Sequence, residues 1–203
     1  DGGTRRIRDT ASVAGLFSLH GGTLKDATVV APVGMLVVGH SSHPRSLTGT
    51  GFNGTLDGVT IDDLLDLNAT SSQARVLNGL TINGTIEMGL ASSLRFQGGT
   101  SQTLDGSGDI VFGPTGEKNL NIDGGTSVTI GSDLTIRGAT GTIGSQGAIT
   151  NEGTIDSDEP GSITVTATTA WTNDGTIRGQ NGGDVRLQGP WTNNGTISIE
   201  DGG

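Results

Sequence analysis

A seven-residue unit occurs three times near the carboxyl end of the chain, as Ile149-Thr-Asn-Glu-Gly-Thr-Ile155, Trp171-Thr-Asn-Asp-Gly-Thr-Ile177 and Trp191-Thr-Asn-Asn-Gly-Thr-Ile197. These copies begin 22 and then 20 residues apart, and a looser copy, Leu80-Thr-Ile-Asn-Gly-Thr-Ile86, lies far upstream. Repetition at a period of about 20 residues is typical of a solenoid, in which every repeat forms one coil of a stack. The repeat therefore predicts the architecture more directly than it predicts a function.

The composition favours short strands joined by glycine turns. The 203 residues include 37 glycines without a Gly-X-Y period, which excludes collagen. Apolar residues occur in short alternating runs, such as Ser127-Val-Thr-Ile130 and Asp184-Val-Arg-Leu187, and disordered segments lack such runs. The only stretch with a helical look is Ile61-Asp-Asp-Leu-Leu-Asp-Leu67. We therefore expect an all-β protein.

One coil can be followed in the sequence from Gly175 to Asn194. It contains three short strands and three turns within about 20 residues, and the coil before it matches. Three strands per coil, stacked in register, predict a right-handed parallel β-helix (β-solenoid) with about 20–22 residues per coil. We expect residues 1–50 to form irregular first coils and residues 51–203 to form regular coils of one continuous domain. We also expect this domain to belong to a longer protein or fibre, because the last copy of the unit is as regular as the others.

Charge and apolar content narrow the range of partners. The formal net charge is −10, and such a surface repels nucleic-acid backbones and anionic membranes. No stretch approaches the roughly 20 apolar residues of a membrane helix. We therefore expect no nucleic-acid partner and no membrane insertion. Because there is no cysteine, backbone ladders and packing rather than disulfides must hold the fold.

Alternation along the repeated unit separates inward from outward residues. Successive side chains of a strand point to opposite faces, and Thr172, Asp174 and Thr176 form a face that is polar in every copy. The opposite face is therefore predicted to be the core, where amides bond one another along the stack and glycines turn the chain with φ > 0. This predicted structural ladder consists of Asn151, Asn173 and Asn193, of Ile155, Ile177 and Ile197, of Ile149, Trp171 and Trp191, and of Gly153, Gly175 and Gly195.

The sequence predicts no catalytic residue and no cofactor. A weak calcium candidate is the acidic turn with Asp156, Asp158 and Glu159, since Ca²⁺ prefers oxygen ligands. The turn lacks the repeated ligand frame of calcium-binding β-rolls, so solvated loop acids are the simpler interpretation. If Trp171 and Trp191 were exposed, their rings would suit stacking on sugars. The alternation places both on the inward face, which favours a stack in the core.

Three other possibilities are disfavoured. His40-Ser-Ser-His43 has the spacing of a metal site, but neither a cysteine nor an obvious third ligand accompanies it. The outward file Thr154, Thr176 and Thr196 is of the kind seen in ice-binding solenoids, but the coil length varies. Polysaccharide lyases and hydrolases also use parallel β-helices, with acidic and basic residues in a groove on one sheet. No such set recurs in adjacent coils, so a polysaccharide-active enzyme is the alternative rather than the first hypothesis.

The Asn-x-Gly-Thr-Ile units, together with the Gly, Thr and Asn content and the lack of Cys, resemble the β-helical shafts of bacterial surface proteins. These are the filamentous-haemagglutinin-like exoproteins and the autotransporter passenger domains, and the resemblance covers residues 48–203. It implies an extracellular or cell-surface location and a role in adhesion, biofilm or matrix assembly. The first hypothesis is therefore a structural or adhesive segment without catalysis. Its expected partners are further coils of the same polypeptide or like subunits end to end, and glycans of cell surfaces or matrix.

Overall fold

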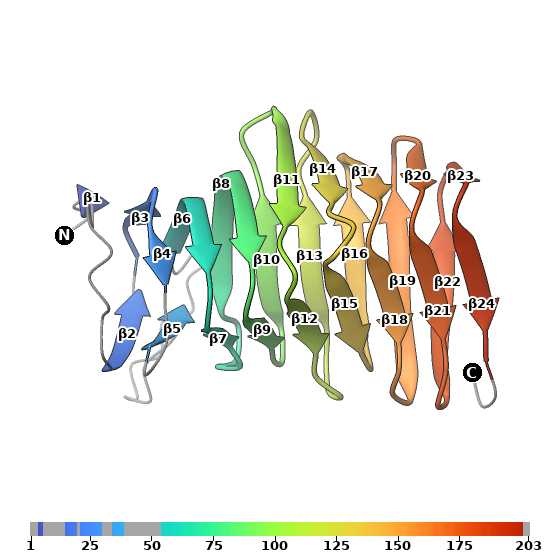
Figure 1. Cartoon of the computed structure of the whole chain (residues 1–203), viewed down its shortest axis with the longest axis horizontal. Coiled ribbons are helices and arrows are strands. Elements are labelled where there is room, and N and C mark those ends of the chain that lie inside the picture. Colours follow the sequence, from blue (N-terminus) through green and yellow to red (C-terminus); the bar gives the residue numbers. More distant parts are fainter. Residues whose placement is uncertain (1–3, 6–14, 20, 30–33, 39–53, 201–203) are drawn as a thin grey trace.

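The structure is a computed structural model that describes residues 4–5, 15–19, 21–29, 34–38 and 54–200. Within these ranges every regular element is a β-strand, and the predicted all-β class is confirmed. The coils are stacked along the long axis of the molecule, with the first and last described strands at opposite ends of the stack (Figure 1). The chain forms a parallel β-solenoid of about seven turns.

The strands are short because a turn follows after each face of a coil. In chain order they are β1 (Thr4–Arg5), β2 (Gly15–Leu19), β3 (Thr23–Lys25), β4 (Thr28–Val29), β5 (Gly34–Val38), β6 (Gly54–Ile61), β7 (Leu64–Leu67), β8 (Gln73–Ile82), β9 (Thr85–Met88), β10 (Ser92–Phe96), β11 (Ser101–Asp105), β12 (Asp109–Phe112), β13 (Lys118–Ile122), β14 (Ser127–Ile130), β15 (Thr135–Gly138), β16 (Gly141–Ser145), β17 (Ala148–Asn151), β18 (Thr154–Ser157), β19 (Gly161–Ala167), β20 (Trp171–Asn173), β21 (Thr176–Gly179), β22 (Gly183–Gln188), β23 (Trp191–Asn193) and β24 (Thr196–Ile199).

Each coil runs around three faces. In the later coils every face holds one strand, so that β16, β17 and β18 form one coil and β19, β20 and β21 form the next. The long strand β8 bends around one corner, since its first half pairs with β10 and its end pairs with β11. The bend joins two faces into a 15-stranded sheet, and the third face is a nine-stranded sheet from β2 to β24.

The strands stay in register although the length of the coils varies. On the nine-stranded sheet Ile136 pairs with Ile155, 19 residues later, whereas Ile110 pairs with Ile136, 26 residues later. This range is wider than the 20–22 residues that the repeated units predict. The additional residues lie in turns such as residues 113–117, so the strand positions themselves are unchanged.

The core consists of inward side chains stacked in files along the axis. On the nine-stranded sheet, one position carries a fully buried aliphatic residue in six successive coils. These residues are Leu65, Ile86, Ile110, Ile136, Ile155 and Ile177. Burying such a side chain contributes roughly 1.5–3 kcal/mol, so a single file contributes a large share of the stability of the stack.

The segment with a helical look is not helical. Ile61 ends β6 and Leu64–Leu67 is β7, which pairs in parallel with β5 and β9. Leu65 and Leu67 are buried, as expected for every second residue of a strand. Before residue 54, β1 to β5 pair within the same two sheets, while His40 and His43 lie outside the described residues.

Candidate functional site

One inward position of the 15-stranded sheet changes its chemistry along the rod. Aliphatic residues occupy it in the earlier coils, and asparagines occupy it in the later ones. In order along the axis, the residues at this position are Leu80, Leu104, Ile130, Asn151, Asn173 and Asn193. We call it the ladder position, because the three asparagines bond to one another.

The asparagine ladder has a direction. Asn151 Nδ2 donates to Asn173 Oδ1 at 2.7 Å, and Asn173 Nδ2 donates to Asn193 Oδ1 at 2.7 Å. Each of these two donors also approaches the carbonyl of a glycine in its own coil and of a threonine in the following coil, at 3.3–3.4 Å. Asn151 and Asn173 are fully buried, and these bonds offset the cost of removing their amides from water. Asn151 Oδ1 has no partner, because the preceding coil carries Ile130 at this position.

Trp171 is a core residue. Its side chain is only 1% exposed, and its Nε1 donates to the carbonyl oxygen of Gln188 at 3.0 Å. Ile149 is likewise buried on β17 of the preceding coil. The ring of Trp191 stacks on that of Trp171, with 5.9 Å between ring centroids and 27° between the planes. A buried ring at Trp171 cannot serve as a sugar-stacking platform.

The last copy of the repeated unit is in register but is not buried. Trp191 is 43% exposed and Ile197 39%, whereas their counterparts one coil earlier, Trp171 and Ile177, are at most 1% exposed. Asn193 is also exposed. These three residues stack on their counterparts in the preceding coil, as expected for inward positions, but they are exposed rather than buried in the core. The reason is that β24 is the last strand of the described residues, so none of them covers this side of the coil.

Glycine is required in the repeated unit for a different reason from the one predicted. Gly153, Gly175 and Gly195 are not among the residues with positive φ, so the backbone conformation does not require glycine there. A Cβ added at Gly175 would instead lie 2.2 Å from the carbonyl oxygen of Gly153, and one at Gly195 would lie 2.1 Å from that of Gly175. Successive coils approach so closely at this corner that any side chain would push them apart.

The three acids of the predicted acidic turn are not all solvated, because Asp156 is a buried residue of β18 and only Asp158 and Glu159 follow that strand. Asp156 is only 4% exposed, and its Oδ2 accepts hydrogen bonds from Arg178 and from Gln180 Nε2, the latter at 3.0 Å. Asp158 Oδ2 lies 3.6 Å from a guanidinium nitrogen of Arg137. Only Glu159 is exposed as predicted for the whole turn. Within the described ranges no three His, Cys, Asp or Glu side chains are placed to hold a metal ion.

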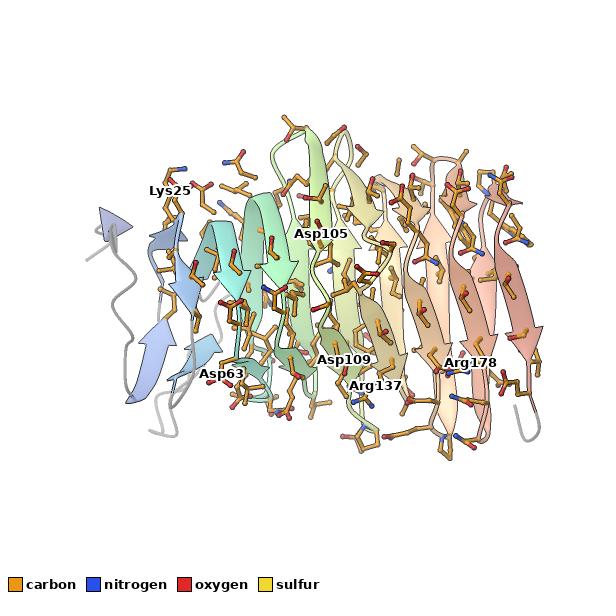
Figure 2. The ribbon with its side chains drawn as sticks, in the orientation of Figure 1. Lys25, Asp63, Asp105, Asp109, Arg137 and Arg178 are labelled. Carbon is orange, nitrogen blue, oxygen red and sulfur yellow. The ribbon has the colours of Figure 1, made fainter. Side chains whose placement is uncertain are left out.

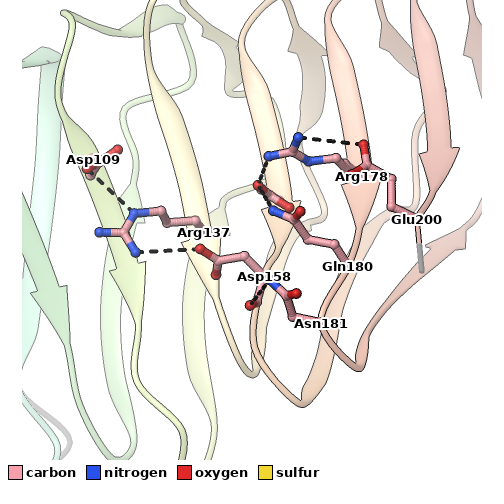
Figure 3. A network of polar contacts seen from close by, with 8 residues as sticks. Asp109, Arg137, Asp158, Arg178, Gln180, Asn181 and Glu200 are labelled. Atoms are coloured by element: carbon pink, nitrogen blue, oxygen red, sulfur yellow. Dashed lines mark hydrogen bonds and ion pairs between the residues drawn. The ribbon is translucent and has the colours of Figure 1, made fainter. Parts of the chain in front are cut away.

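These acids belong to a network of alternating charges along the axis (Figure 3). Arg137 bridges Asp109, at 3.5 Å, and Asp158 in the coils on its two sides. Arg178 bridges Asp156 and, at 3.6 Å, Glu200. The hydrogen bond with Asp156 raises the pKa of Arg178 above its ordinary range. Asp109, Arg137 and Arg178 follow one another along the rod (Figure 2).

Sequence reasoning missed this network although a signal was present. The residue after the stacked isoleucine is Arg137, then Asp156, then Arg178 in three successive coils, and the strand register makes them neighbours. Opposite charges one coil apart at one repeat position can pair and stabilise a sheet. Here Asp156 pairs with Arg178 in this way, whereas Arg137 pairs with Asp109 and Asp158, so the alternation predicts only part of the network. Aligning the coils by their Thr-Ile dipeptides reveals the alternation.

Two further buried ionic groups lie in the earlier coils. Lys118 is fully buried, and its Nζ donates to the carbonyl oxygens of Gly113 and, at 2.9 Å, Gly116. Burial lowers the pKa of Lys118. Burial alone would raise the pKa of Asp57, but bonds from Lys25 Nζ at 2.8 Å and from an amide of β8 outweigh it and lower that pKa.

One face of the solenoid carries uncharged hydroxyl side chains in register. The outward threonines of β11, β14, β17, β20 and β23 pair with one another from coil to coil. They are Thr103, Thr129, Thr150, Thr172 and Thr192. Ser101 and Ser127 flank two of them and are joined by a hydrogen bond of 2.9 Å. We call this surface the hydroxyl face; its regularity persists through coils of unequal length.

Comparisons with protein-family models, with curated proteins and with solved structures find nothing that matches this chain. The solenoid itself is compatible with the bacterial β-helical shafts named above. In the part of the chain that the structure describes, no helix has the length and apolarity needed to cross a membrane.

Proposed function

We propose that the chain is a length of shaft in a secreted or cell-surface bacterial protein, with a structural or adhesive role and no catalysis. The observation that carries this proposal is the axial direction of the contacts. The asparagine ladder, the isoleucine file and the bridges of Arg137 and Arg178 all join one coil to the next. Side chains used in this way resist bending and separation of coils, which is what a shaft requires.

Adhesion in this proposal takes place on the hydroxyl face and through the turns. The face offers rows of hydroxyl groups at the strand spacing of about 4.8 Å, on a rigid support. Hydroxyl groups both donate and accept hydrogen bonds, and sugars present the same groups. The proposed ligands are therefore neutral segments of cell-surface or matrix glycans. The proposed end-on partners are further coils of the same polypeptide or like subunits.

A polysaccharide panel tests the proposal and its alternative together. We expect binding of some polymers, with no shortening of any chain and no new reducing ends. The test variant replaces Thr129, Thr150 and Thr172 by alanine, and the control replaces Thr142 and Thr164, which pair outward on another face. Binding should weaken in the test variant alone. Depolymerisation by the wild-type chain would favour the alternative, a lyase or hydrolase on the same fold.

A further inference from the structure

Two arginines lie directly opposite each other on the face formed by the first half of β8, by β10 and by β13. Arg75 of β8 and Arg95 of β10 are partners in the parallel register, so their side chains leave the same face one coil apart, at the strand spacing of about 4.8 Å. Arg75 is half-buried, and the side chain of Arg95 is 41% exposed. Across the described strands, no other two basic residues are register partners.

This pairing departs from the rule that the rest of the solenoid follows. Like charges at opposed positions of neighbouring strands destabilise a sheet, and the nine-stranded sheet avoids this by placing an acid between two arginines of one column. The column of Arg75 and Arg95 continues instead to Thr55 and Asn121, which are uncharged. Departures from such rules are expected at functional sites. An anion held between the two guanidinium groups would supply the negative charge that offsets their repulsion.

An acid at one end of the pair orients Arg95. Asp123 Oδ1 accepts from Arg95 Nε at 2.6 Å, and Asp123 Oδ2 accepts from Gln97 Nε2 at 2.6 Å. A guanidinium group has five N–H donors, so a carboxylate at Nε fixes its plane without using all of them. The planar group matches the two oxygens of a carboxylate. A carboxylate ligand can therefore bind while the present partners of both arginines stay in place.

Uncharged hydrogen-bonding side chains flank the pair. Gln73 and Ser93 lie two residues before the arginines on the same strands, and Asn119 occupies this position on the next strand. Ser93 Oγ accepts from Asn121 Nδ2 at 3.1 Å, so the hydroxyl proton of Ser93 remains to be donated. Amide and hydroxyl groups beside a carboxylate site match a sugar acid, which presents hydroxyl groups beside its carboxyl group.

We propose that Arg75 and Arg95 bind a carboxylate of a polyuronate, an acidic polysaccharide in which each sugar carries a carboxyl group. Gln73, Ser93 and Asn119 contact the hydroxyl groups of the same chain. The inference rests on the proposed adhesive role and deepens it, because it names an acidic glycan for a face other than the hydroxyl face. The net charge of −10 repels such a polymer elsewhere, so this pair of arginines decides where it binds.

The experiment measures binding of polygalacturonate to the full chain by titration calorimetry, with dextran as the neutral reference. The test variants are Arg75→Gln and Arg95→Gln. We expect the affinity to fall about tenfold or more in each, because a hydrogen bond between charged groups is lost. The matched control is Arg186→Gln, which changes an exposed arginine on the same face whose register partner is Thr164. This control should leave the affinity unchanged.

Lysine variants separate the geometry of the site from its charge. Arg75→Lys and Arg95→Lys keep the positive charge and lose the planar fork, so their affinity for polygalacturonate should lie between that of the wild-type chain and that of the glutamine variants. Circular dichroism verifies the fold of every variant. If a glutamine variant fails to fold, the corresponding lysine variant gives the test, since it should still bind more weakly than the wild-type chain.

Unchanged affinity in both glutamine variants, or an equal loss in Arg186→Gln, would overturn the inference. Equal binding of dextran would overturn it as well, because the contact would then not depend on charge. Tighter binding of polyglutamate than of polygalacturonate would assign the arginines to an acidic protein instead. Binding of neutral polysaccharides that depends on the hydroxyl face, without binding of polygalacturonate, would overturn this inference alone and leave the proposed adhesive role standing.

Discussion

The coils before residue 140 and those after it share one backbone plan but fill the ladder position differently. Leu104 and Ile130 are buried among aliphatic side chains, whereas Asn151 and Asn173 bond to each other. An aliphatic file needs only similar volume from coil to coil, so Leu, Ile and Val are interchangeable there. An amide ladder needs the same residue in neighbouring coils. This requirement explains why the sequence repeat is closest in the later coils and looser before them.

The corner beside the ladder position differs in the same way. From the ladder position to the stacked isoleucine there are six residues in the earlier coils, as from Ile130 to Ile136, but four in the later coils, as from Asn151 to Ile155. In the short corner the asparagine amide reaches the carbonyl of Gly153 in its own coil. In the longer corner between Ile130 and Ile136, a further buried apolar residue, Leu134, is present instead. The amide is thus suited to a tight corner with carbonyls within reach.

The largest effect is expected where a charge enters a file that both regions share. Ile177→Asp buries a carboxylate among aliphatic side chains and should cost more than about 4 kcal/mol, abolishing cooperative folding of the later coils. The control, Thr176→Asp, places the same group on the outward face and should change stability by no more than about 0.5 kcal/mol. Urea unfolding followed by circular dichroism measures both. Similar behaviour of the two variants would contradict the assignment of inward and outward faces, and a larger loss in Thr176→Asp would mean that they are reversed.

The difference between the two regions can be tested by placing an asparagine at the ladder position of the earlier coils. Leu104→Asn places an amide between Leu80 and Ile130, which offer no side-chain partner, and should cost about 2–5 kcal/mol. Ile130→Asn makes the same kind of change beside Asn151, whose free Oδ1 can accept from the new amide. Its cost should be smaller by about 1 kcal/mol or more. Equal losses of unfolding free energy in the two variants, measured in urea, would show that an added asparagine gains no stability from Asn151.

A loss within the ladder should be smaller. Asn173→Ala leaves Asn151 Nδ2 and Asn193 Oδ1 without their side-chain partners and should cost about 1–3 kcal/mol. Asp174→Ala alters the adjacent exposed position, whose carboxylate accepts from Asn194 Nδ2, and serves as the matched control. Denaturant midpoints of the two variants give the comparison. An Asp174→Ala variant destabilised as much as Asn173→Ala would contradict the ladder.

The stability of the earlier and the later coils should also change differently with pH in the alkaline range. Burial lowers the pKa of Lys118 in the native state, so between that pKa and the ordinary value of about 10.4 the unfolded chain binds more protons. Stability of the earlier coils should therefore rise with pH across this window. The pKa of Arg178 is raised instead, so the later coils should show no such rise.

Denaturant unfolding at increasing pH, with amide exchange resolved by region, measures this effect. Lys118→Met removes the titrating group and keeps an extended side chain, so the rise should disappear in that variant. A rise that persists without Lys118 would assign the effect to another group. At acidic pH the same sign holds for Asp57: its lowered pKa contributes stability that is lost as pH falls through its native pKa.

Calcium is expected to have the smallest effect, in either region. Asp156 is bonded to Arg178 and Gln180, and Asp158 lies beside Arg137, so Ca²⁺ would have to displace guanidinium groups. Stabilisation should not exceed about 0.4 kcal/mol, the value when free ligand equals its Kd. Thermal unfolding in millimolar calcium and then in chelator measures it. A reversible rise in Tm of more than about 10 °C would show that the acidic turn is a calcium site.

The sequence by itself determined the all-β class, the stacking of coils and the presence of a repeated inward asparagine. It could do so because alternation along a strand and hydrogen bonding between identical residues both produce a periodic pattern in the sequence. The placement of Asn173 and Ile177 follows from this pattern alone. Asp156 and Arg178 produced a weaker pattern, since opposite charges recur at one repeat position only when coils of unequal length are aligned.

Tertiary structure alone decided the features that depend on distances between coils. Gly175 is required by a carbonyl of the preceding coil and not by its own φ, and no local pattern distinguishes the two reasons. Lys118 occupies the position of Ser92 and is buried only because the turn before it folds its carbonyls over the ammonium group. The exposure of Trp191 likewise depends on what lies beside it, because identical units are buried or open according to whether another coil covers them.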